Sequence, residues 1–457
     1  MEDKVLSAVL AVANMKSGTA TSREWDAAAS AFYDTLGVMA AGISSQTVTK
    51  LVRARFREPV DHAIVRRWLL QDIIPESQLA EWLLIAGTAA HALDFDDVLE
   101  PMNGHPSAVL VPLIWGVGRS VGADSAAIMD AYIFGVRVCG AVASQVDVRT
   151  AYARGWHATS VIGALAAATS AARLMSLSED ELVHALGMAA SLTSGIRQNF
   201  GTDTKPLHVG LAARTGYEAS WCSWWAKCGL TSSRRALDGR QGWAALFGAR
   251  ETGHIGTYGT STKPLQDPGL DQKPYPCCYN TQRLATAGVR AHGLLEGRTV
   301  QSVHATVESG ATQPLIYENP NTGLEAKFSA QYVLAESVLE GALPLSSFAD
   351  DYVARARSRA LIPHITVTES PTYQGRSYEY PNGFANVIVE FTNGEKINVV
   401  EYIPWGHHLK PLAQTDLKQK MISCCDYAGM SDSEKDSLIQ QISHLTNVKN
   451  RLPVLHH

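Results

Sequence analysis

Four short segments place acidic or basic side chains beside Pro or Gly, where regular secondary structure is interrupted. The first, residues 91–107 (HALDFDDVLEPMNGHPS), holds Asp94, Asp96 and Asp97 on a predicted helix that runs into a loop ending at His105. Carboxylates this close repel one another in an isolated helix, so a cation, a helix N-terminus or a metal has to compensate them. Solvated acids that cap a loop are the plainer interpretation, and a charged functional site is the alternative.

The second segment, residues 155–163 (GWHATSVIG), places His157 directly before a predicted helix of small residues. An imidazole at that position lies beside free backbone N–H groups, which attract anions. A lone histidine there more often has only a structural role. The third segment, residues 201–214 (GTDTKPLHVGLAAR), brings Lys205 and His208 to the proline-containing start of another helix.

The fourth segment, residues 272–280 (QKPYPCCYN), carries Lys273 and Tyr275 at the boundary between a helical region and a region with strands. A lysine before proline is usually only a loop charge. All four segments, however, put Lys, His or Asp beside Pro or Gly at the end of an element, and functional side chains concentrate at such places. We therefore treat them as one candidate site.

The elements that must position these groups are helices up to about residue 250. Apolar residues recur three and four positions apart in Ala-rich segments. Ser178 and Glu181 form a predicted capping box at the start of a further helix. Abundant Ala and Gly allow helix axes to approach closely, which favours a many-helix domain over a layered α/β sheet. The clearest helical segments are residues 27–41, 81–93, 125–143 and 160–174.

Between about residues 265 and 400 several prolines interrupt helices and strand-like runs follow. The strongest is a predicted hairpin across an Asn393-Gly394 turn. From Asp416 the pattern is helical again, and we expect this tail to rejoin the first helices. The sequence thus predicts a mainly α fold, with a large all-α helical domain built from both chain ends and a smaller inserted, lid-like α+β domain. The predicted strands are residues 303–308, 365–368, 384–391 and 396–402, with a helix at 329–339; the predicted domains are residues 1–265 with 403–457, and residues 266–402.

Composition excludes several function classes. The 457 residues include 39 Lys and Arg against 44 Asp and Glu, a net charge of −5, and 46% are hydrophobic. Without a Lys/Arg-rich run, we expect neither a nucleic-acid partner nor a membrane-surface partner. No apolar run reaches the ~18–20 residues of a membrane span, and Glu2 and Asp3 stand where a secretory signal has positive charge. Seven cysteines, with two adjacent pairs, suit neither a disulfide framework nor zinc spacing, so a cytoplasmic protein is expected.

Six motifs spread over nearly the whole chain resemble the MmgE/PrpD family, in that family's order. They are DFDDVLEPMNGHPS, GWHATSVIG, TKPLHVGLAAR, KPYPCCYN, EAKFSAQYV (residues 325–333) and WGHHLKPL (residues 405–412). The family includes 2-methylcitrate dehydratases, cis-aconitate decarboxylases and iminodisuccinate epimerases. The resemblance implies the same two-domain fold, a homodimer, and a small anionic carboxylate as substrate.

The resemblance also implies which residues form the site. The catalytic positions are Asp94, His105, His157, Lys205 and Lys273, and the substrate-binding positions are His208, Tyr275 and Tyr317. The chain departs from the decarboxylase branch at Val98, where that branch has Thr, and at Cys277-Cys278-Tyr279, the stretch in which that branch has a further His. The GHPS and GWHATS wording is closer to epimerase-like members. Dehydration, decarboxylation and epimerisation of a diacid such as iminodisuccinate therefore stay open.

These reactions all create a carbanion-like centre next to a carboxylate. The charge that develops needs fixed cations, for which Lys205 and Lys273 are the candidates. A histidine moves the proton, although the sequence does not say which histidine is base and which is acid. Because no P-loop is present and GVGRSVG (residues 116–122) lacks the GxGxxG spacing, we expect cofactor-free chemistry without a metal.

Two rival interpretations belong to other classes. Asp96, Asp97 and Glu100 form a DDxxE string, which Mg²⁺-dependent prenyl-diphosphate enzymes use on a helix. The second acidic motif that such enzymes need is missing from the sequence. The other rival is a noncatalytic dimer that only binds carboxylates, which ligand-induced stabilisation without turnover would reveal.

Overall fold

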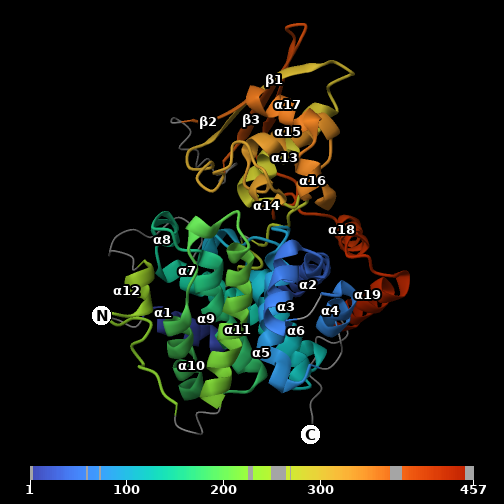
Figure 1. Cartoon of the computed structure of the whole chain (residues 1–457). Coiled ribbons are helices and arrows are strands. Elements are labelled where there is room, and N and C mark those ends of the chain that lie inside the picture. Colours follow the sequence, from blue (N-terminus) through green and yellow to red (C-terminus); the bar gives the residue numbers. More distant parts are fainter. Residues whose placement is uncertain are drawn as a thin grey trace.

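The computed structural model describes residues 4–57, 60–70, 74–224, 230–248, 264–267, 269–370 and 383–447. Its larger part is an assembly of helices from both ends of the chain (Figure 1). From the first part come α1 (Lys4–Ala13), α2 (Ser22–Ile43), α3 (Gln46–Phe56), α4 (His62–Leu70), α5 (Glu76–His91), α6 (Pro106–Ser120), α7 (Ser125–Gln145), α8 (Val148–Ala153), α9 (Ala158–Leu174), α10 (Glu179–Leu192), α11 (Thr204–Trp224) and α12 (Trp243–Phe247). The end of the chain adds α18 (Gln414–Tyr427) and α19 (Asp432–Thr446).

The four predicted Ala-rich helices are confirmed as parts of α2, α5, α7 and α9. The predicted capping box is also present: the Ser178 side chain accepts from the backbone N–H of Glu181, and the Glu181 carboxylate accepts from the N–H of Ser178. One boundary was wrong, because α5 ends at His91 rather than at residue 93. This difference moves three aspartates off the helix.

Glycine sets how closely α5 and α11 pack. A Cβ atom on Gly87 of α5 would lie 2.8 Å from the Cα atom of Gly210 of α11, and a Cβ on Gly210 would lie 2.1 Å from the carbonyl oxygen of Leu84. Only glycine allows this approach. The contact also brings the end of α5, with His91, to the start of α11, with Lys205. The candidate site is built where these two helix ends meet.

The segment GVGRSVG lies at the end of α6 and not in a cofactor loop. A Cβ atom on Gly116 would lie 2.7 Å from the indole ring of Trp82, so this glycine serves helix packing. The interpretation of the segment as a packing surface is thereby confirmed.

The smaller part combines helices with one sheet, and Figure 1 shows it on top of the helical assembly. Strand order is β2-β1-β3-β4, with β1 and β2 parallel and the other neighbours antiparallel. The predicted hairpin is confirmed as β3 and β4, in register with Val387 opposite Val399. The elements are α13 (Gln282–His292), β1 (Val300–Glu308), α14 (Gly323–Ala326), α15 (Ala330–Glu340), α16 (Asp350–Val353), α17 (Ala356–Leu361), β2 (Ile365–Ser370), β3 (Ala385–Phe391) and β4 (Lys396–Glu401).

Buried apolar side chains form two large cores. The first contains residues of α1 to α12 and of α18 and α19, including Met421 and Ile442. The second is built from the sheet and the helices around it. The chain is therefore mainly α, with a large helical part made from both ends and a smaller α+β part between them, as predicted. A third, small cluster with Leu93, Phe95 and Leu345 lies where the two parts meet.

Helix α7 corrects one expectation about membranes. By length and composition alone it is apolar enough to cross a bilayer, although Asp130 and Arg137 interrupt its apolar residues. In the structure, 89% of its most apolar window is buried, against α1, α6 and α9 among others. Core helices of soluble proteins pass the same test, and the core position of α7 fits that explanation.

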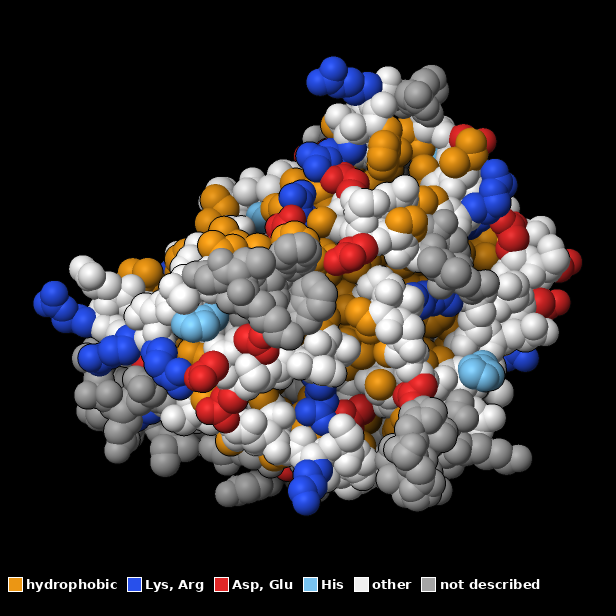
Figure 2. All heavy atoms as spheres, turned by 90° about the horizontal axis from the view of Figure 1, so that it is seen from below, with side chains coloured by type: hydrophobic (Ala, Val, Ile, Leu, Met, Phe, Trp, Pro, Cys, Tyr) orange, Lys and Arg blue, Asp and Glu red, His pale blue; other side chains and the backbone are white. Residues whose placement is uncertain are grey.

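The described side chains on the face in Figure 2 carry both signs of charge. Lys and Arg lie among Asp and Glu there, without a continuous basic area in the coloured part of the view. The absence of a nucleic-acid partner and the cytoplasmic location both stay predictions.

Candidate active site

The loop between α5 and α6 carries the acids of the first sequence segment. Asp94, Asp96 and Asp97 lie in this loop and not on a helix, so the helical prediction for them was wrong. Asp94 has a φ of 51°, in the left-handed region, which ends helical continuation. A non-glycine residue held there is strained, and such residues cluster at functional sites.

The structure brings Asp94, Lys205 and Lys273 together. Lys205 Nζ donates to Asp94 Oδ1 at 3.1 Å, and Lys273 Nζ donates to the same oxygen at 2.8 Å. Lys273 Nζ also donates to the backbone carbonyl of Asp94 at 2.8 Å. All three side chains are buried, and Lys273 is completely so. One carboxylate therefore holds two ammonium groups side by side.

His91 and Asp96 complete this arrangement, although the sequence did not assign them to the site. His91 Nδ1 lies 2.8 Å from Asp96 Oδ2, and its Nε2 lies 2.8 Å from Lys205 Nζ. Because an ammonium group only donates and an ionised carboxylate only accepts, His91 carries its proton on Nδ1 and accepts at Nε2. We call His91, Asp94, Asp96, His105, Lys205 and Lys273 the Asp94 cluster.

His105 presents an unprotonated ring nitrogen to the cluster. Its Nδ1 lies 2.8 Å from the carbonyl oxygen of Asp97 and 3.2 Å from Asp96 Oδ2. Both are acceptors, so the proton is on Nδ1 and Nε2 has a free lone pair. Nε2 lies 4.0 Å from Asp94 Oδ1. Burial lowers the pKa of His105, and the ring is neutral at pH 7.

His157 and His208 form a pair next to the cluster. Their Nδ1 atoms are 3.2 Å apart, and the His157 ring stacks on His91 with centroids 6.0 Å apart. Burial, together with the charge of Lys205, lowers the pKa of His208 to about 4 and that of His157 well below its usual range. The predicted side chains His105, His157, Lys205, His208 and Lys273 thus lie around one point.

Three helices begin at this point. His105 is the N-cap residue of α6, His157 is the N-cap residue of α9, and Lys205 lies in the first turn of α11. Each helix N-terminus carries about half a positive charge, in addition to its free N–H groups. Their convergence favours an anionic ligand.

The acids of the cluster are ionised. Burial alone would raise the pKa of Asp94, but Lys205 and Lys273 hold it well below its ordinary value. His91 and His105 do the same for Asp96. Burial lowers the pKa of Lys273, yet Asp94 and Asp96 outweigh it, so that pKa is raised overall. The two lysines therefore compensate the charge of Asp94, and the two histidines stabilise the ionised Asp96.

Asp97 differs from its neighbours, because it faces Ser107 instead of a cation. The Ser107 hydroxyl donates to Asp97 Oδ2 and contacts the Tyr132 hydroxyl at 2.6 Å. Burial raises the pKa of Asp97 to about 8, which makes this carboxyl neutral at pH 7. Since Asp96 and Asp97 face different partners, they do not form the paired metal ligands that the DDxxE interpretation needs.

The two predicted tyrosines, Tyr275 and Tyr317, are not members of the Asp94 cluster. Tyr317 is half-buried, and its hydroxyl donates to the backbone carbonyl of Phe200 at 3.3 Å. Phe200 in turn lies below Lys205 and edge-on to His157, so Tyr317 covers the rim of the site. Tyr275 packs into the second core instead, with its ring edge-on to Trp405.

His91 and Asp96 were missed because local sequence does not show which side chains turn inward. Both stand in the same string, HALDFDD, as Asp94. The available signal was a histidine at the end of an apolar helix, three residues before an aspartate. The left-handed backbone at Asp94 decides that Asp96 faces His91 and His105 while Asp97 faces away.

The two departures from the decarboxylase branch have different places. Val98 is buried and pairs through its backbone with Asp271, which fixes the loop to the segment before Lys273. Cys278 is close enough to Asp94 and Lys273 to feel their charges, and burial raises the pKa of its thiol to about 11. A neutral thiol therefore lies near the Asp94 cluster.

Among the residues that the structure describes, two groups of side chains have the composition of metal ligands. In the first, single atoms of His91, Asp94, Asp96 and His105 lie within 4.8 Å of one another. Both nitrogens of His91 and the Oδ1 atom of Asp94 are already hydrogen-bonded within the Asp94 cluster. A cation would also lie beside two ammonium groups, so this donor set suits an anion better.

The second group is Asp271, His407 and His408. Here Asp271 Oδ1 accepts from both the backbone N–H and the Nδ1–H of His408, and Oδ2 accepts from the Tyr279 hydroxyl. His407 Nδ1 accepts from the backbone N–H of Leu409, so its proton is on Nε2. Both carboxylate oxygens of Asp271 and the Nδ1 atom of His407 thus already accept hydrogen bonds from the protein.

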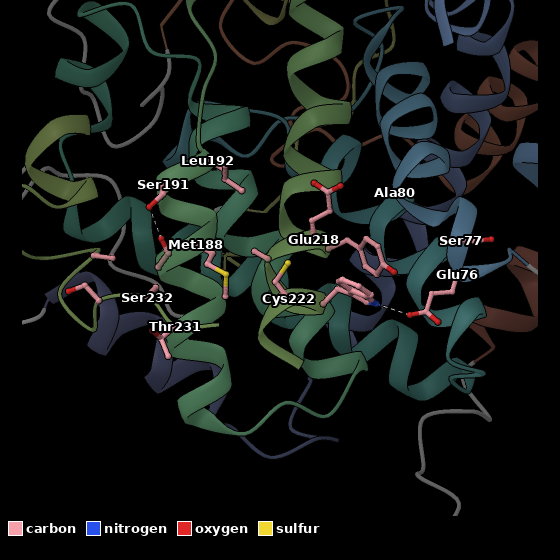
Figure 3. Close-up of a pocket in the computed structure, with 16 residues that line it drawn as sticks. Glu76, Ser77, Ala80, Met188, Ser191, Leu192, Glu218, Cys222, Thr231 and Ser232 are labelled. Atoms are coloured by element: carbon pink, nitrogen blue, oxygen red, sulfur yellow. Dashed lines mark hydrogen bonds between the residues drawn. The ribbon is translucent and has the colours of Figure 1, made fainter. Parts of the chain in front are cut away.

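A groove lies away from the Asp94 cluster (Figure 3). It has a volume of about 910 Å³ and is lined by residues of α5, α10, α11 and residues 231–236. Its charged lining residues are Glu76 and Glu218, and Glu76 accepts a hydrogen bond from the indole of Trp221. An acidic, mostly apolar groove does not fit the carboxylate substrate that the charges of the Asp94 cluster favour.

The fold and the site together define a class: a mainly α protein with an inserted α+β part and a buried lysine–carboxylate–histidine cluster near their junction. The MmgE/PrpD N-terminal domain matches residues 9–253, and the MmgE/PrpD C-terminal domain matches residues 275–445. The chain belongs to the MmgE/PrpD family, which confirms the resemblance of its motifs.

Curated relatives include three proteins named cis-aconitate decarboxylase. The human protein (Homo sapiens) is 26% identical over 375 residues, which cover 80% of this chain and 76% of that protein. The mouse protein (Mus musculus) is 26% identical over 349 residues, covering 74% and 70%. The protein of Aspergillus terreus is 22% identical over 356 residues, covering 69% and 68%.

Proposed function

We propose that this protein is a lyase for a small di- or tricarboxylate of the aconitate type, acting by proton transfer at a carbon next to a carboxylate. The observation that carries the proposal is the pair of lysines on Asp94, beside the free Nε2 atom of His105. The cis-aconitate decarboxylases among the relatives support the substrate class. The residues of the cluster supply the chemistry in this proposal, without a cofactor.

The two lysines can bind a substrate only if some of their N–H groups are not already used within the Asp94 cluster. An ammonium group has three N–H donors. Lys205 gives one to Asp94 and one to His91, and Lys273 gives two to Asp94. One N–H on each lysine therefore remains for a substrate carboxylate. As negative charge builds up on that carboxylate, these two donors stabilise it, and losing one such donor typically costs about 10²- to 10³-fold in rate.

His105 is the proposed proton carrier. Its Nδ1–H is fixed by the Asp97 carbonyl and by Asp96, so Nε2 is oriented toward the cluster. A positioned imidazole contributes roughly 10²- to 10⁴-fold. His157, whose ring stacks on His91, lies next to the Asp94 cluster and is the proposed second proton carrier. A bound polyanion raises the pKa of both imidazoles, because opposite charge favours the protonated form.

In decarboxylation, the bond between a carbon and its carboxylate breaks and CO₂ leaves. The electron pair stays on the carbon skeleton, delocalised toward a remaining carboxylate that the lysines hold. The same skeleton then takes a proton from an imidazolium ring. Lys205 and Lys273 thus stabilise the intermediate, and His105 or His157 ends it.

Dehydration is the second candidate, and one atom favours it. Asp94 Oδ2 is buried and has no hydrogen-bond partner. An ionised oxygen in that state is costly, and a substrate hydroxyl would satisfy it. A citrate-like hydroxy acid brings such a donor. Here His105 Nε2 removes a proton from the carbon next to a carboxylate, and hydroxide leaves with a proton from His157.

The Asp94 cluster and the neighbouring His157 are nearly closed to solvent. Asp94 is 3% and His157 2% exposed. The Phe200 ring contacts Lys205 and His157, and the Tyr317 hydroxyl donates to the Phe200 carbonyl, so we propose that these two residues move when a substrate enters.

The proposal is tested by incubating the protein with a panel of di- and tricarboxylates in D₂O. We expect deuterium at a carbon next to a carboxylate, together with loss of CO₂ or water, and loss of both signals in His105→Asn. Exchange with inversion and no net loss would identify an epimerase. Thermal stabilisation by an acid without exchange or turnover would identify a noncatalytic binder and contradict the proposal.

A further inference from the structure

Two buried lysines outside the Asp94 cluster bind backbone carbonyls next to it. Lys327 Nζ donates to the carbonyl oxygens of Leu93 at 2.7 Å and Pro276 at 2.8 Å. Lys420 Nζ donates to the carbonyl oxygens of Phe95 and Lys273, both at 2.8 Å. Each lysine thus joins the Asp94 loop to the segment that carries Lys273.

Each of the two lysines binds one carbonyl beside Asp94 and one carbonyl in the segment of Lys273. Leu93 and Phe95 are the two neighbours of Asp94, so Lys327 holds the peptide group before Asp94 and Lys420 holds the peptide group that follows Phe95. The other ends of the two bridges are Lys273 itself and Pro276, three residues later. From this geometry we propose that Lys327 and Lys420 are positioning residues, which set Asp94 and Lys273 at the separation that the reaction needs.

The two lysines come from opposite parts of the molecule. Lys420 lies on α18 and forms an ion pair with Asp34 of α2 at 2.5 Å, within the helical part. Lys327 directly follows α14, in the α+β part, and its Nζ lies 4.5 Å from the centroid of the Phe348 ring. The two bridges therefore fasten the site to both cores.

Backbone strain explains why such bridges are needed. Asp94 has a left-handed φ of 51°, a conformation that aspartate adopts more readily than most residues but at a cost that its surroundings have to offset. Its side chain is pulled by two ammonium groups, and nothing in the loop itself forms a regular element from residue 92 to 97. Carbonyls anchored at residues 93 and 95 prevent the loop from relaxing. Lys420 adds a contact with the Phe95 ring, 3.9 Å from its centroid.

Neither lysine is placed to act on a substrate directly. The contacts of Lys327 Nζ and Lys420 Nζ are with backbone carbonyls, aromatic rings and Asp34. Burial also lowers the pKa of Lys327 to about 7, but a neutral amine still has two N–H donors for two carbonyls. Their effect on the reaction is transmitted through Asp94 and Lys273.

The inference rests on the proposed function and is tested with Lys420→Met and Lys327→Met, each alone and combined with Lys273→Met. We expect kcat of each single variant to fall roughly 10- to 100-fold at a temperature well below its unfolding midpoint, the size expected for a misplacement of about 1 Å. KM should change much less. In the Lys273→Met background, either substitution should have little further effect, because the separation between Asp94 and the Lys273 ammonium group no longer exists to be set.

Lys418→Met is the matched control, since Lys418 is exposed on the same helix as Lys420. It should leave both kcat and stability unchanged. A lowered unfolding midpoint with full kcat in Lys420→Met and Lys327→Met would show a merely structural role and overturn the inference. Equal further losses in the Lys273→Met background would also overturn it. Normal activity of Lys273→Met itself would instead contradict the proposed function.

A rescue experiment covers the case in which Lys420→Met fails to fold. A groove of about 450 Å³, lined by Phe95 and Pro274 among others, reaches Lys420. In Lys420→Ala, propylamine can enter from this groove and replace the missing ammonium group. We expect propylamine to restore kcat at least severalfold, and propanol at the same concentration to have no effect. Equal responses to both compounds would contradict the positioning role.

Discussion

Replacing Lys273 by methionine separates the catalytic role of this lysine from its structural role. Lys273 is completely buried and donates twice to Asp94, which keeps only Lys205 as a partner in the variant. Breaking a buried ion pair costs about 3–5 kcal/mol. Because one partner of Asp94 remains, we expect the lower end, about 3 kcal/mol. Loss of the remaining N–H donor should lower kcat/KM by about 10²- to 10³-fold, or about 2.7–4 kcal/mol.

The double variant Asp94→Asn with Lys273→Met distinguishes the two effects. It removes the carboxylate that lost a partner but leaves the buried Lys205 ammonium without Asp94, so only part of the lost stability should return, measured by denaturant unfolding. Activity should not return, measured as kcat/KM on the acid that the panel identifies. Lys50→Met is the control, since it removes an exposed pair with Asp203 that is worth less than about 1 kcal/mol.

Two results would refute this reasoning. Turnover of Lys273→Met within a few-fold of the unsubstituted protein would show that the lysine does not stabilise the reacting carboxylate. Recovery of activity together with stability in the double variant would show that Lys273 acts only by compensating Asp94.

Three further predictions concern pH, packing and metal. The pKa of Asp97 is about 8 in the folded protein against 3.8 for an ordinary aspartate, so the folded state binds an extra proton and its stability falls as pH rises from about 4 to 8. In Asp97→Asn this fall in stability should be smaller by an amount on the order of a few kcal/mol. Identical unfolding profiles of the two proteins over that pH range would contradict the buried neutral carboxyl. Gly210→Ala should lower stability by a few kcal/mol because its Cβ would lie 2.1 Å from the Leu84 carbonyl oxygen, whereas Gly293→Ala, with its nearest contact at 3.5 Å, should be nearly neutral in the same thermal unfolding assay. Dialysis against EDTA should leave kcat unchanged, and restoration of a lost activity by Mg²⁺ or Zn²⁺ would show that the cluster binds a metal.

The local sequence was sufficient for most of the elements and for the two lysines of the site. Apolar residues three and four apart determine the helices, Ser178 and Glu181 determine a helix start, and Asn393-Gly394 determines the hairpin, since these signals depend on neighbouring residues alone. Lys205 and Lys273 were recognised because charged side chains beside proline mark element ends, and because the surrounding motifs resemble those of a family.

Only the tertiary structure decided what each of the three neighbouring acids contacts. The three aspartates of one loop differ little in sequence, yet Asp94 holds two lysines, Asp96 orients two histidines, and Asp97 is a neutral carboxyl on Ser107. Their roles depend on the left-handed backbone at Asp94 and on partners from distant parts of the chain. Both lysines that bind Asp94 lie more than a hundred residues after it. Such contacts exist only after the two cores have packed, because burial and long-range charge, rather than local pattern, set the direction and the pKa of each side chain.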